Sequence, residues 1–384
     1  MTRPTILLAG GGTGGHVFPL VAVADALRDE ADVRVVYVGT ARGLETRVVP
    51  ARGDELELLD VVPIKGGGVT GALKGVTKAA LALPRARALV GRLSPAVVLS
   101  AGGYAAGPVA LAAWSAGVPV ALLEPNGVLG LANRWLRPLV RRAYVAFPEV
   151  EAAVGERRAL RTGVPLRRGF APIGYRAVAG RMRVVVLGGS QGALALDRTL
   201  PEALGLALRE TPGLDVLHQC GKGREAEVRA AYERAGVAAE VVPFIDDVAG
   251  ALAGADVVVG RAGAGFLAEL CVVGRASILV PFPFAADDHQ RRNAESLAAE
   301  GAATCIVQSE ASAERLAGAI VALGRDVEAR TRMAVAAGSR GRPDAARDVA
   351  RDLLTLGGIG RRAVEPTSDG AARTRGSITE AAHV

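Results

Sequence analysis

Short apolar runs alternate with segments of helical spacing along most of this 384-residue chain. The first run, at residues 6–9, leads into a glycine-rich stretch, and residues 21–27 then show helical spacing. Six later runs are equally short and apolar: 33–38, 96–100, 118–122, 215–219, 255–259 and 277–280. Strands that alternate with helices are typical of parallel sheets covered by helices. We therefore expect an α/β protein.

The second half of the chain begins as the first half does. The stretch "MRVVVLGGSQGALALD", residues 182–197, again runs from a β-branched strand through glycines into a helix. The repeat predicts two doubly wound domains, 1–163 and 164–341, facing a cleft, since open sheets bind ligands at the carboxyl ends of their strands. A helix at about 342–356 can pack back on the first domain. The polar tail, 357–384, is expected to be disordered.

No charged residue occurs between Leu93 and Leu123, a stretch long enough to suggest a membrane span. Prolines and glycines divide it, among them Pro95, Gly107 and Pro119. We interpret it as strand, loop, helix and strand, and predict no spanning helix.

The formal net charge of +7 favours an anionic partner, either nucleic acid, a phosphorylated small molecule or an acidic membrane surface. Only 4% of the residues are aromatic and no nucleic-acid-binding module is recognisable, which argues against nucleic acid. The three cysteines lack C-x-x-C spacing and form no metal-ligand pattern with the four histidines. The sequence thus predicts no metal and, without a secretory h-region, a location inside the cell.

Gly10, Gly12 and Gly15 fit the G-x-G-x-x-G pattern between a strand and a helix, which either binds a dinucleotide or is only a tight turn. A nicotinamide site also needs an acidic residue after the next strand, where this chain has Gly-Thr-Ala-Arg at 39–42. No G-x-x-x-x-G-K-[ST] loop occurs. Two helix N-termini at one cleft suit a diphosphate or two phosphorylated substrates.

His16 lies at the start of the first predicted helix. It could simply bond a neighbouring carbonyl group. The helix dipole, however, disfavours the imidazolium form and leaves the ring able to accept a proton. A general base is therefore the second interpretation.

Eight stretches occur in the order found in the MurG family of peptidoglycan synthesis, which residues 5–355 resemble. They are "GGGTGGHVFPL", "SAGGYAAGP", "EPNGVLGLANRWL", "VPLR", "GGSQGA", "FIDD", "RAGAGFLAEL" and "DDHQRRNAESL". The resemblance implies a GT-B fold of two Rossmann-like domains and an inverting transferase that needs neither metal nor cofactor. Such an enzyme moves N-acetylglucosamine from UDP-N-acetylglucosamine to the 4-hydroxyl of N-acetylmuramic acid in lipid I, giving lipid II.

The same resemblance assigns the donor-binding residues. They are Thr13, Gly14, Gly15, Asn126, Arg167, Ser190, Gln191, Ile245, Glu269, His289, Gln290 and Asn293. Glu269 matches the acid that accepts from both ribose hydroxyls, and the amide side chains suit sugar hydroxyls because each donates and accepts. Read alone, Glu269 could be a solvated helix residue, and "DDHQRRN" a polar helix start.

On the acceptor side the resemblance implies Gly102, Gly103 and Tyr104, with His16 assisting deprotonation. Glu124 is the alternative base, or the partner that orients the base. The family commonly has His-Glu-Gln-Asn where this chain has Leu-Glu-Pro-Asn at 123–126, so two polar side chains are absent from this loop.

A basic stretch without acidic residues lies between Asp60 and Glu124. Its cations alternate with leucines and valines, and include Lys65, Lys74, Lys78, Arg85 and Arg87. The pattern indicates either a helix lying on an anionic bilayer or an ordinary helix with solvated cations. A polyprenyl-linked acceptor favours the first, and thus peripheral attachment to the cytoplasmic face of the inner membrane, where cell-wall synthesis enzymes are further candidate partners.

Two kinds of rival function remain open from the sequence. The first is another UDP-sugar enzyme of the same fold, with a different acceptor or with 2-epimerase activity. The second is a non-catalytic protein that binds nucleotide sugars, which the altered loop at 123–126 favours slightly.

Overall fold

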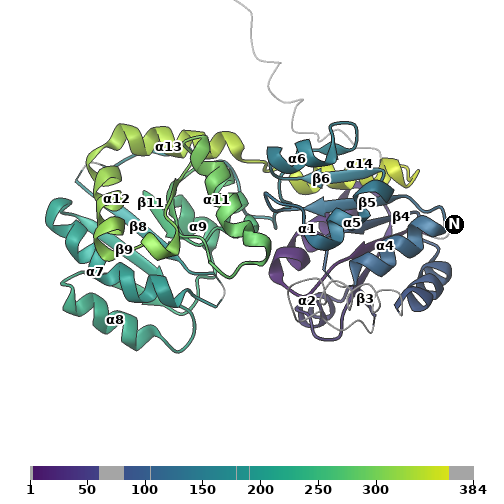
Figure 1. Ribbon diagram of the computed structural model, residues 1–384, viewed down its shortest axis with the longest axis horizontal. Helices are drawn as coiled ribbons and strands as arrows, with labels where there is room; N and C mark the ends of the chain where they lie inside the picture. Colours follow the sequence, from purple (N-terminus) through teal and green to yellow (C-terminus); the bar gives the residue numbers. More distant parts are fainter. Residues whose placement is uncertain (1–2, 60–81, 104, 179, 190, 363–384) are drawn as a thin grey trace, which may run out of the picture.

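The computed structural model describes residues 3–59, 82–103, 105–178, 180–189 and 191–362. Its strands form two wholly parallel sheets, one in each lobe of the molecule (Figure 1). The first sheet has seven strands in the order β3-β2-β1-β4-β5-β6-β7, and the second has six in the order β10-β9-β8-β11-β12-β13. The predicted α/β fold with two doubly wound sheets is confirmed. In each sheet the strand order reverses beside the strand that carries a glycine-rich turn.

Most of the strands have strongly apolar sequences, which is typical of parallel sheets with helices on both faces. Those of the first sheet are β1 (Thr5–Ala9), β2 (Arg34–Gly39), β3 (Glu55–Leu58), β4 (Val97–Ser100), β5 (Val120–Glu124), β6 (Arg142–Val145) and β7 (Ala159–Leu160). Those of the second are β8 (Met182–Leu187), β9 (Leu214–Gln219), β10 (Ala239–Val242), β11 (Val257–Gly260), β12 (Ala276–Leu279) and β13 (Thr304–Cys305).

The helices follow the strands in alternation, as the sequence pattern predicts. They are α1 (Gly14–Glu30), α2 (Glu45–Ala51), a helix over 82–93, α4 (Ala106–Ser115), α5 (Leu131–Leu136), α6 (Pro148–Val154), α7 (Leu194–Glu210), α8 (Glu225–Arg234), α9 (Val248–Ala253), α10 (Ala264–Val273), α11 (His289–Ala299), α12 (Ala313–Arg325), α13 (Val327–Arg340) and α14 (Ala345–Leu356). The described residues also contain three short 3₁₀ turns: η1 (Arg137–Leu139), η2 (Ala286–Asp288) and η3 (Gln308–Glu310).

The uncharged stretch from 93 to 123 contains β4, α4 and β5, as predicted. Its strands lie in the middle of the first sheet, which explains their lack of charge. In the described part of the chain, no helix combines the length and apolar character needed to cross a bilayer.

The last helix returns to the first lobe (Figure 1). Val349 and Leu353 of α14 are buried in the same apolar cluster as Leu27 of α1. Asp352 accepts hydrogen bonds from Tyr144 (2.8 Å) and from the Arg142 Nε (2.9 Å). The segment that follows α14 also contacts the first lobe.

Residues 357–362 belong to the stretch expected to be disordered, yet they contact the first lobe. The Arg362 N–H donates to the Glu30 carbonyl group (2.8 Å), and Ile359 packs against the apolar cluster around α1. The remainder of that tail lies outside the described residues.

Candidate active site

The first glycine turn joins β1 to α1 and places His16 in the first turn of that helix. Thr13 is the exposed N-cap residue, and Gly14 and Gly15 begin the helix. The half-buried His16 ring has its Nδ1 3.1 Å from the Gly11 carbonyl oxygen. Because a carbonyl oxygen only accepts, Nδ1 carries the proton, and the Nε2 of the neutral ring is an acceptor.

The predicted acceptor loop lies against this ring. Gly102 and Gly103 both have positive φ angles, +87° and +85°, which only glycine adopts readily. A methyl group on Gly102 would lie 3.7 Å from the His16 Nε2, and one on Gly103 would lie 3.0 Å from the Gly11 oxygen. The structure therefore brings these glycines and His16 together. Tyr104 lies outside the described residues.

A protein carboxylate occupies the first glycine turn. Glu45, the first residue of α2, is buried, and its Oε2 accepts from the Gly12 N–H (2.8 Å). Its Oε1 accepts from the Thr40 N–H (2.8 Å) and the Thr40 hydroxyl (3.1 Å). Methyl groups on Gly11 or Gly43 would lie 2.2 Å or 2.0 Å from this carboxylate. The turn is thus closed around an internal anion.

The other predicted acid, Glu124, is buried at the end of β5 and held by its own loop. It accepts from the Asn126 N–H and side-chain amide (3.2 Å each), the Gly130 N–H (2.8 Å) and the Asn133 Nδ2 (3.0 Å). Asn133 also lies beside Gly102, at 3.7 Å from a methyl group placed there. This arrangement favours a role for Glu124 in orienting the loop.

Two predicted sugar ligands meet between the lobes. Asn293 of α11 donates from Nδ2 to the Asn126 Oδ1 (3.3 Å) and to the Ala262 carbonyl oxygen (3.1 Å). Its Oδ1 accepts from the Gly127 N–H (2.7 Å). Asn293 is fully buried, so these bonds connect the loop after β5 directly to the second lobe.

The second glycine turn, between β8 and α7, is held by hydrogen bonds to its carbonyl groups. Gln219 donates to the Gly189 oxygen (2.8 Å), and Arg224 donates to the Gln191 oxygen (2.6 Å) and to the Cys220 oxygen. Gly192 has φ +69°, and a methyl group there would lie 2.0 Å from the Cys220 oxygen. Ser190 lies outside the described residues. The N-terminus of α7 begins directly after this turn, with Ala193 as an N-cap that offers no side-chain hydrogen bond.

A buried polar network supports this second turn. Arg224 Nε lies 3.1 Å from Asp197, which is in the first turn of α7. The other Asp197 oxygen lies 3.1 Å from the His218 Nε2, and the His218 Nδ1 lies 2.8 Å from the Tyr232 hydroxyl. Burial, followed by the charge of Asp197, raises the pKa of Tyr232. One arrangement of protons satisfies both contacts: the Tyr232 hydroxyl donates to the His218 Nδ1, and the His218 Nε2 donates to Asp197.

Glu269 of α10, the predicted ribose ligand, faces Arg167 at 3.9 Å. Burial raises the pKa of Glu269 to about 7, although the guanidinium of Arg167 acts in the opposite direction. A half-buried carboxylate with one distant cation has unused acceptor capacity. It is therefore suited to a ligand with paired hydroxyl donors.

The remaining predicted donor residues surround the same end of the second sheet. The Gln290 Oε1 accepts from the Ala262 N–H (3.1 Å) and the Phe282 N–H (3.0 Å). The His289 Nδ1 donates to the Ala286 oxygen (2.7 Å), and Ile245 packs against the apolar cluster under β11. These contacts orient both side chains at the start of α11.

The predicted membrane stretch is described only in part. Lys65, Lys74 and Lys78 lie outside the described residues. Arg85 and Arg87 are exposed on the helix over 82–93. Its leucines and valines do not face outward, since Leu89, Val90 and Leu93 are buried in the core of the first lobe.

Sequence reasoning missed Glu45, Arg224 and Gln219. Glu45 and Arg224 lie in polar stretches whose composition suggests a solvated loop or helix start, whereas Gln219 is the buried last residue of β9. One signal for Glu45 is the pair of glycines at 39 and 43, because a close approach by a side chain requires them. Only the fold brings Arg224 beneath a turn that precedes it by more than thirty residues.

Comparison with known proteins identifies the family of the chain. The N-terminal domain of glycosyltransferase family 28 matches residues 6–145, and its C-terminal domain matches residues 183–349. A transferase of Sorangium cellulosum (strain So ce56) is 56% identical, over 98% of this chain and 96% of its own length. It is named UDP-N-acetylglucosamine--N-acetylmuramyl-(pentapeptide) pyrophosphoryl-undecaprenol N-acetylglucosamine transferase, as is a relative from Anaeromyxobacter sp. (strain K) at 43% identity over 91% of this chain and 92% of its own length.

Comparison with solved structures identifies the same family. The crystal structure of MurG from Acinetobacter baumannii matches with a TM-score of 0.77 and 31% identity, covering 92% of this chain and all of that one. The calicheamicin glycosyltransferase CalG4 covers 92% of this chain and 99% of its own, with a TM-score of 0.65 at 19% identity, which shows the shared GT-B fold alone. The chain is a glycosyltransferase of family 28 and belongs to the MurG family.

Proposed function

We propose that this enzyme transfers N-acetylglucosamine from UDP-N-acetylglucosamine to lipid I and so produces lipid II. The observation that carries this proposal is the near full-length relationship to transferases named for that reaction. The two glycine turns support it, because a histidine follows the first and the helix N-terminus after the second has no side-chain cap.

The chemistry follows from the His16 tautomer. Nε2 accepts the proton of the 4-hydroxyl of the acceptor while that oxygen forms a bond to the anomeric carbon. The bond from this carbon to the UDP phosphate breaks, and UDP leaves with the electron pair on the opposite face. The configuration at the anomeric carbon is therefore inverted.

The donor half stabilises the leaving diphosphate and holds the nucleoside. The first N–H groups of α7 and the guanidinium of Arg167 offer positive charge to the phosphates. Glu269 accepts from the ribose hydroxyls, while Asn126, Gln290 and Asn293 contact the sugar. Thr13, Gly14 and Gly15 border the reacting sugar from the other turn.

The same proposal places the enzyme on the cytoplasmic face of the inner membrane. Arg85 and Arg87 are exposed cations on the first lobe. Trp114 of α4 and Trp135 of α5 are exposed by 49% and 65%, and these two helices pack together. Exposed indoles and exposed cations on one lobe suit the interface of an anionic bilayer.

The test is transfer of labelled N-acetylglucosamine to lipid I in detergent, with donor affinity measured separately by calorimetry with UDP. We expect His16→Ala to lower turnover by about 10²–10⁴-fold with UDP affinity unchanged, because only proton transfer is lost. His16→Asn is the matched control, since its amide can still donate to the Gly11 oxygen but cannot act as a base. It should be as inactive as His16→Ala.

Each other outcome has a definite meaning. Equal loss of turnover and UDP affinity in His16→Ala contradicts the base assignment. If the wild type binds UDP-N-acetylglucosamine but forms no disaccharide with lipid I, the proposed acceptor is wrong. A different sugar acceptor, epimerisation or simple nucleotide-sugar binding then becomes the better explanation.

A further inference from the structure

One peptide group links a buried carboxylate to the proposed base. On its nitrogen side, the Gly12 N–H donates to the Glu45 Oε2 at 2.8 Å. On its carbonyl side, the Gly11 oxygen accepts from the His16 Nδ1 at 3.1 Å. Glu45, the Gly11–Gly12 peptide and His16 therefore form one continuous hydrogen-bonded chain.

We propose that Glu45 is a positioning residue for the transfer reaction, which acts on His16 through this peptide group. A carboxylate that accepts from an N–H polarises the peptide and makes its carbonyl oxygen a stronger acceptor. The stronger acceptor holds the proton on the His16 Nδ1 and leaves Nε2 free to take the acceptor proton. The inference rests on the proposed role of His16 as base.

The same chain stabilises the product of proton transfer. When Nε2 takes the proton, the ring becomes positively charged while Nδ1 still donates to the Gly11 oxygen. The negative charge of Glu45 lies directly behind that oxygen, and the carboxylate is buried, so solvent screens it little. Glu45 thus favours the charged ring without touching the substrate.

The surroundings of Glu45 show that its position is built in. Its three hydrogen bonds come from neutral donors on two segments of the chain, and a methyl group on Gly11, Gly39 or Gly43 would overlap with it. The contact between Glu45 and the turn therefore requires glycine at these three positions.

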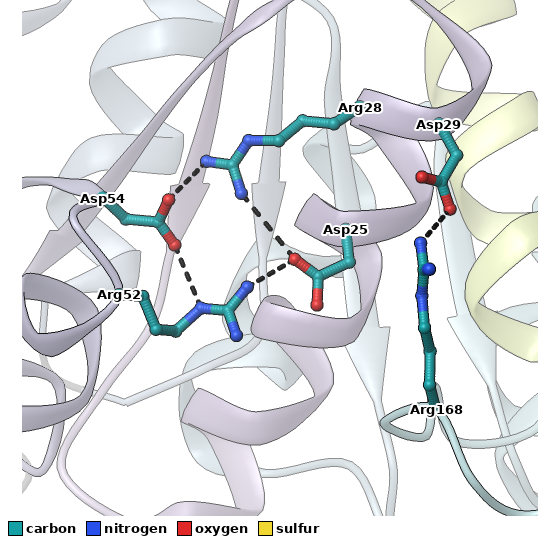
Figure 2. Close-up of polar contacts among 6 residues, drawn as sticks. All are labelled: Asp25, Arg28, Asp29, Arg52, Asp54 and Arg168. Atoms are coloured by element: carbon teal, nitrogen blue, oxygen red, sulfur yellow. Dashed lines mark hydrogen bonds and ion pairs between the residues drawn. The ribbon is translucent and has the colours of Figure 1, made fainter.

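The helix that carries Glu45 is anchored to the helix that carries His16. Arg52 and Asp54, just beyond α2, form ion pairs with Asp25 and Arg28 of α1 (Figure 2). The Arg28 Nη2 lies 2.6 Å from Asp54, whose side chain is only 9% exposed. Fixing α2 to α1 in this way holds the carboxylate at the turn.

The decisive variant is Glu45→Gln, which removes the charge and places an amide N–H₂ among N–H donors. We expect the His16 tautomer to shift from the Nδ1–H form toward the Nε2–H form, and turnover to fall roughly tenfold or more. UDP affinity should remain within twofold. Nitrogen NMR on protein with ¹⁵N-labelled histidine reads the tautomer directly, with the His16 signals assigned from His16→Asn.

Two further variants separate an electrostatic role from a structural one. Glu55→Gln neutralises an exposed carboxylate on β3 that pairs with Arg34, and should change neither the tautomer nor turnover. Thr40→Val removes only the hydroxyl donor on the other oxygen of Glu45 and keeps the bond to Gly12. Its effect on the tautomer should be clearly smaller than that of Glu45→Gln.

The outcomes distinguish this inference from the proposed function. An unchanged tautomer in folded Glu45→Gln overturns the inference, whatever the activity. A shifted tautomer with unchanged turnover supports the link from Glu45 to the ring and refutes His16 as the base. If Glu45→Gln does not fold, the wild-type spectrum decides, because a ring in the Nε2–H form overturns the inference.

Discussion

The two glycine turns of this enzyme look alike in the sequence and are held in opposite ways. The first turn is filled from inside by the Glu45 carboxylate, which uses the Gly12 N–H. The second turn is held by side chains from another part of the chain, since Gln219 and Arg224 donate hydrogen bonds to the carbonyl oxygens of Gly189 and Gln191. One turn is therefore supplied with an anion by the protein, while the other remains available for the anion of a substrate.

This difference shows that a glycine pattern fixes the shape of a turn and not its ligand. What a turn can bind depends on which of its peptide groups the protein already uses. In the proposed mechanism the first turn serves the histidine that follows it, whereas the second binds the diphosphate. Three predictions test this contrast.

The largest effect is expected from paired glycine substitutions. Gly192→Ala places a methyl group 2.0 Å from the Cys220 backbone oxygen at φ +69°, so we expect at least about a 100-fold loss of UDP affinity as the turn is displaced. Gly11→Ala instead displaces Glu45 and should lower turnover while UDP affinity remains within twofold. Calorimetry with UDP and the transfer assay measure the two effects.

Gly318→Ala is the control for this pair. It lies inside α12 with no atom within 4 Å of the added methyl group, and should raise stability slightly, by about 0.5–1 kcal/mol. If Gly11→Ala and Gly192→Ala impair the same property, the division of labour between the turns is wrong.

An intermediate effect is expected from Arg224→Gln. The change weakens the hydrogen bonds to the Gln191 and Cys220 oxygens and leaves the buried Asp197 carboxylate without its cation. We expect the KM for the donor to rise roughly 10- to 30-fold, with a smaller change in kcat, because the turn moves while His16 does not. Steady-state kinetics at saturating acceptor measure this split, and a change confined to kcat would contradict it.

A smaller and two-sided effect is expected from Glu269→Gln. The pKa of Glu269 is raised to about 7 in the folded protein. The contribution of Glu269 to stability is therefore complete below about pH 4.5 and is lost as the pH rises through 7, so the ionised side chain destabilises the folded protein above that pH. At pH 8 the variant should be more stable by roughly 1–3 kcal/mol. It should also bind UDP about tenfold more weakly, because the ribose loses a charged acceptor.

The pH dependence gives a further check on Glu269. Wild-type affinity for UDP should fall as the pH drops below about 7, where the carboxyl group becomes protonated. Glu269→Gln serves as the reference, because it retains the titration of the diphosphate itself. Parallel curves for the two proteins, from calorimetry between pH 6 and 8, would exclude a role for this carboxylate in binding.

The sequence predicted the central strands of both sheets because buried parallel strands are short, apolar and bounded by glycine, but it missed β3, β6, β7, β10 and β13. It also brought His16, Gly102 and Gly103 to one place through the family resemblance. It could not predict which groups hold the turns. Glu45 reaches the first turn from α2 and Arg224 reaches the second from beyond β9, and such contacts depend on the spacing of neighbouring strands rather than on local pattern.

The contact of Asn293 between the lobes leaves one position unused. Its two amide hydrogens go to Asn126 and Ala262, and its oxygen accepts one bond from Gly127, so a second lone pair of that oxygen is unspent. Because Asn293 is fully buried, a sugar hydroxyl or acetamido N–H can donate there only after the contact between the two lobes has opened. A sugar that binds at this oxygen must therefore compete with the hydrogen bonds from Asn293 to Asn126 and from Gly127 to Asn293, so donor binding at this residue would be coupled to the separation of α11 from the loop after β5.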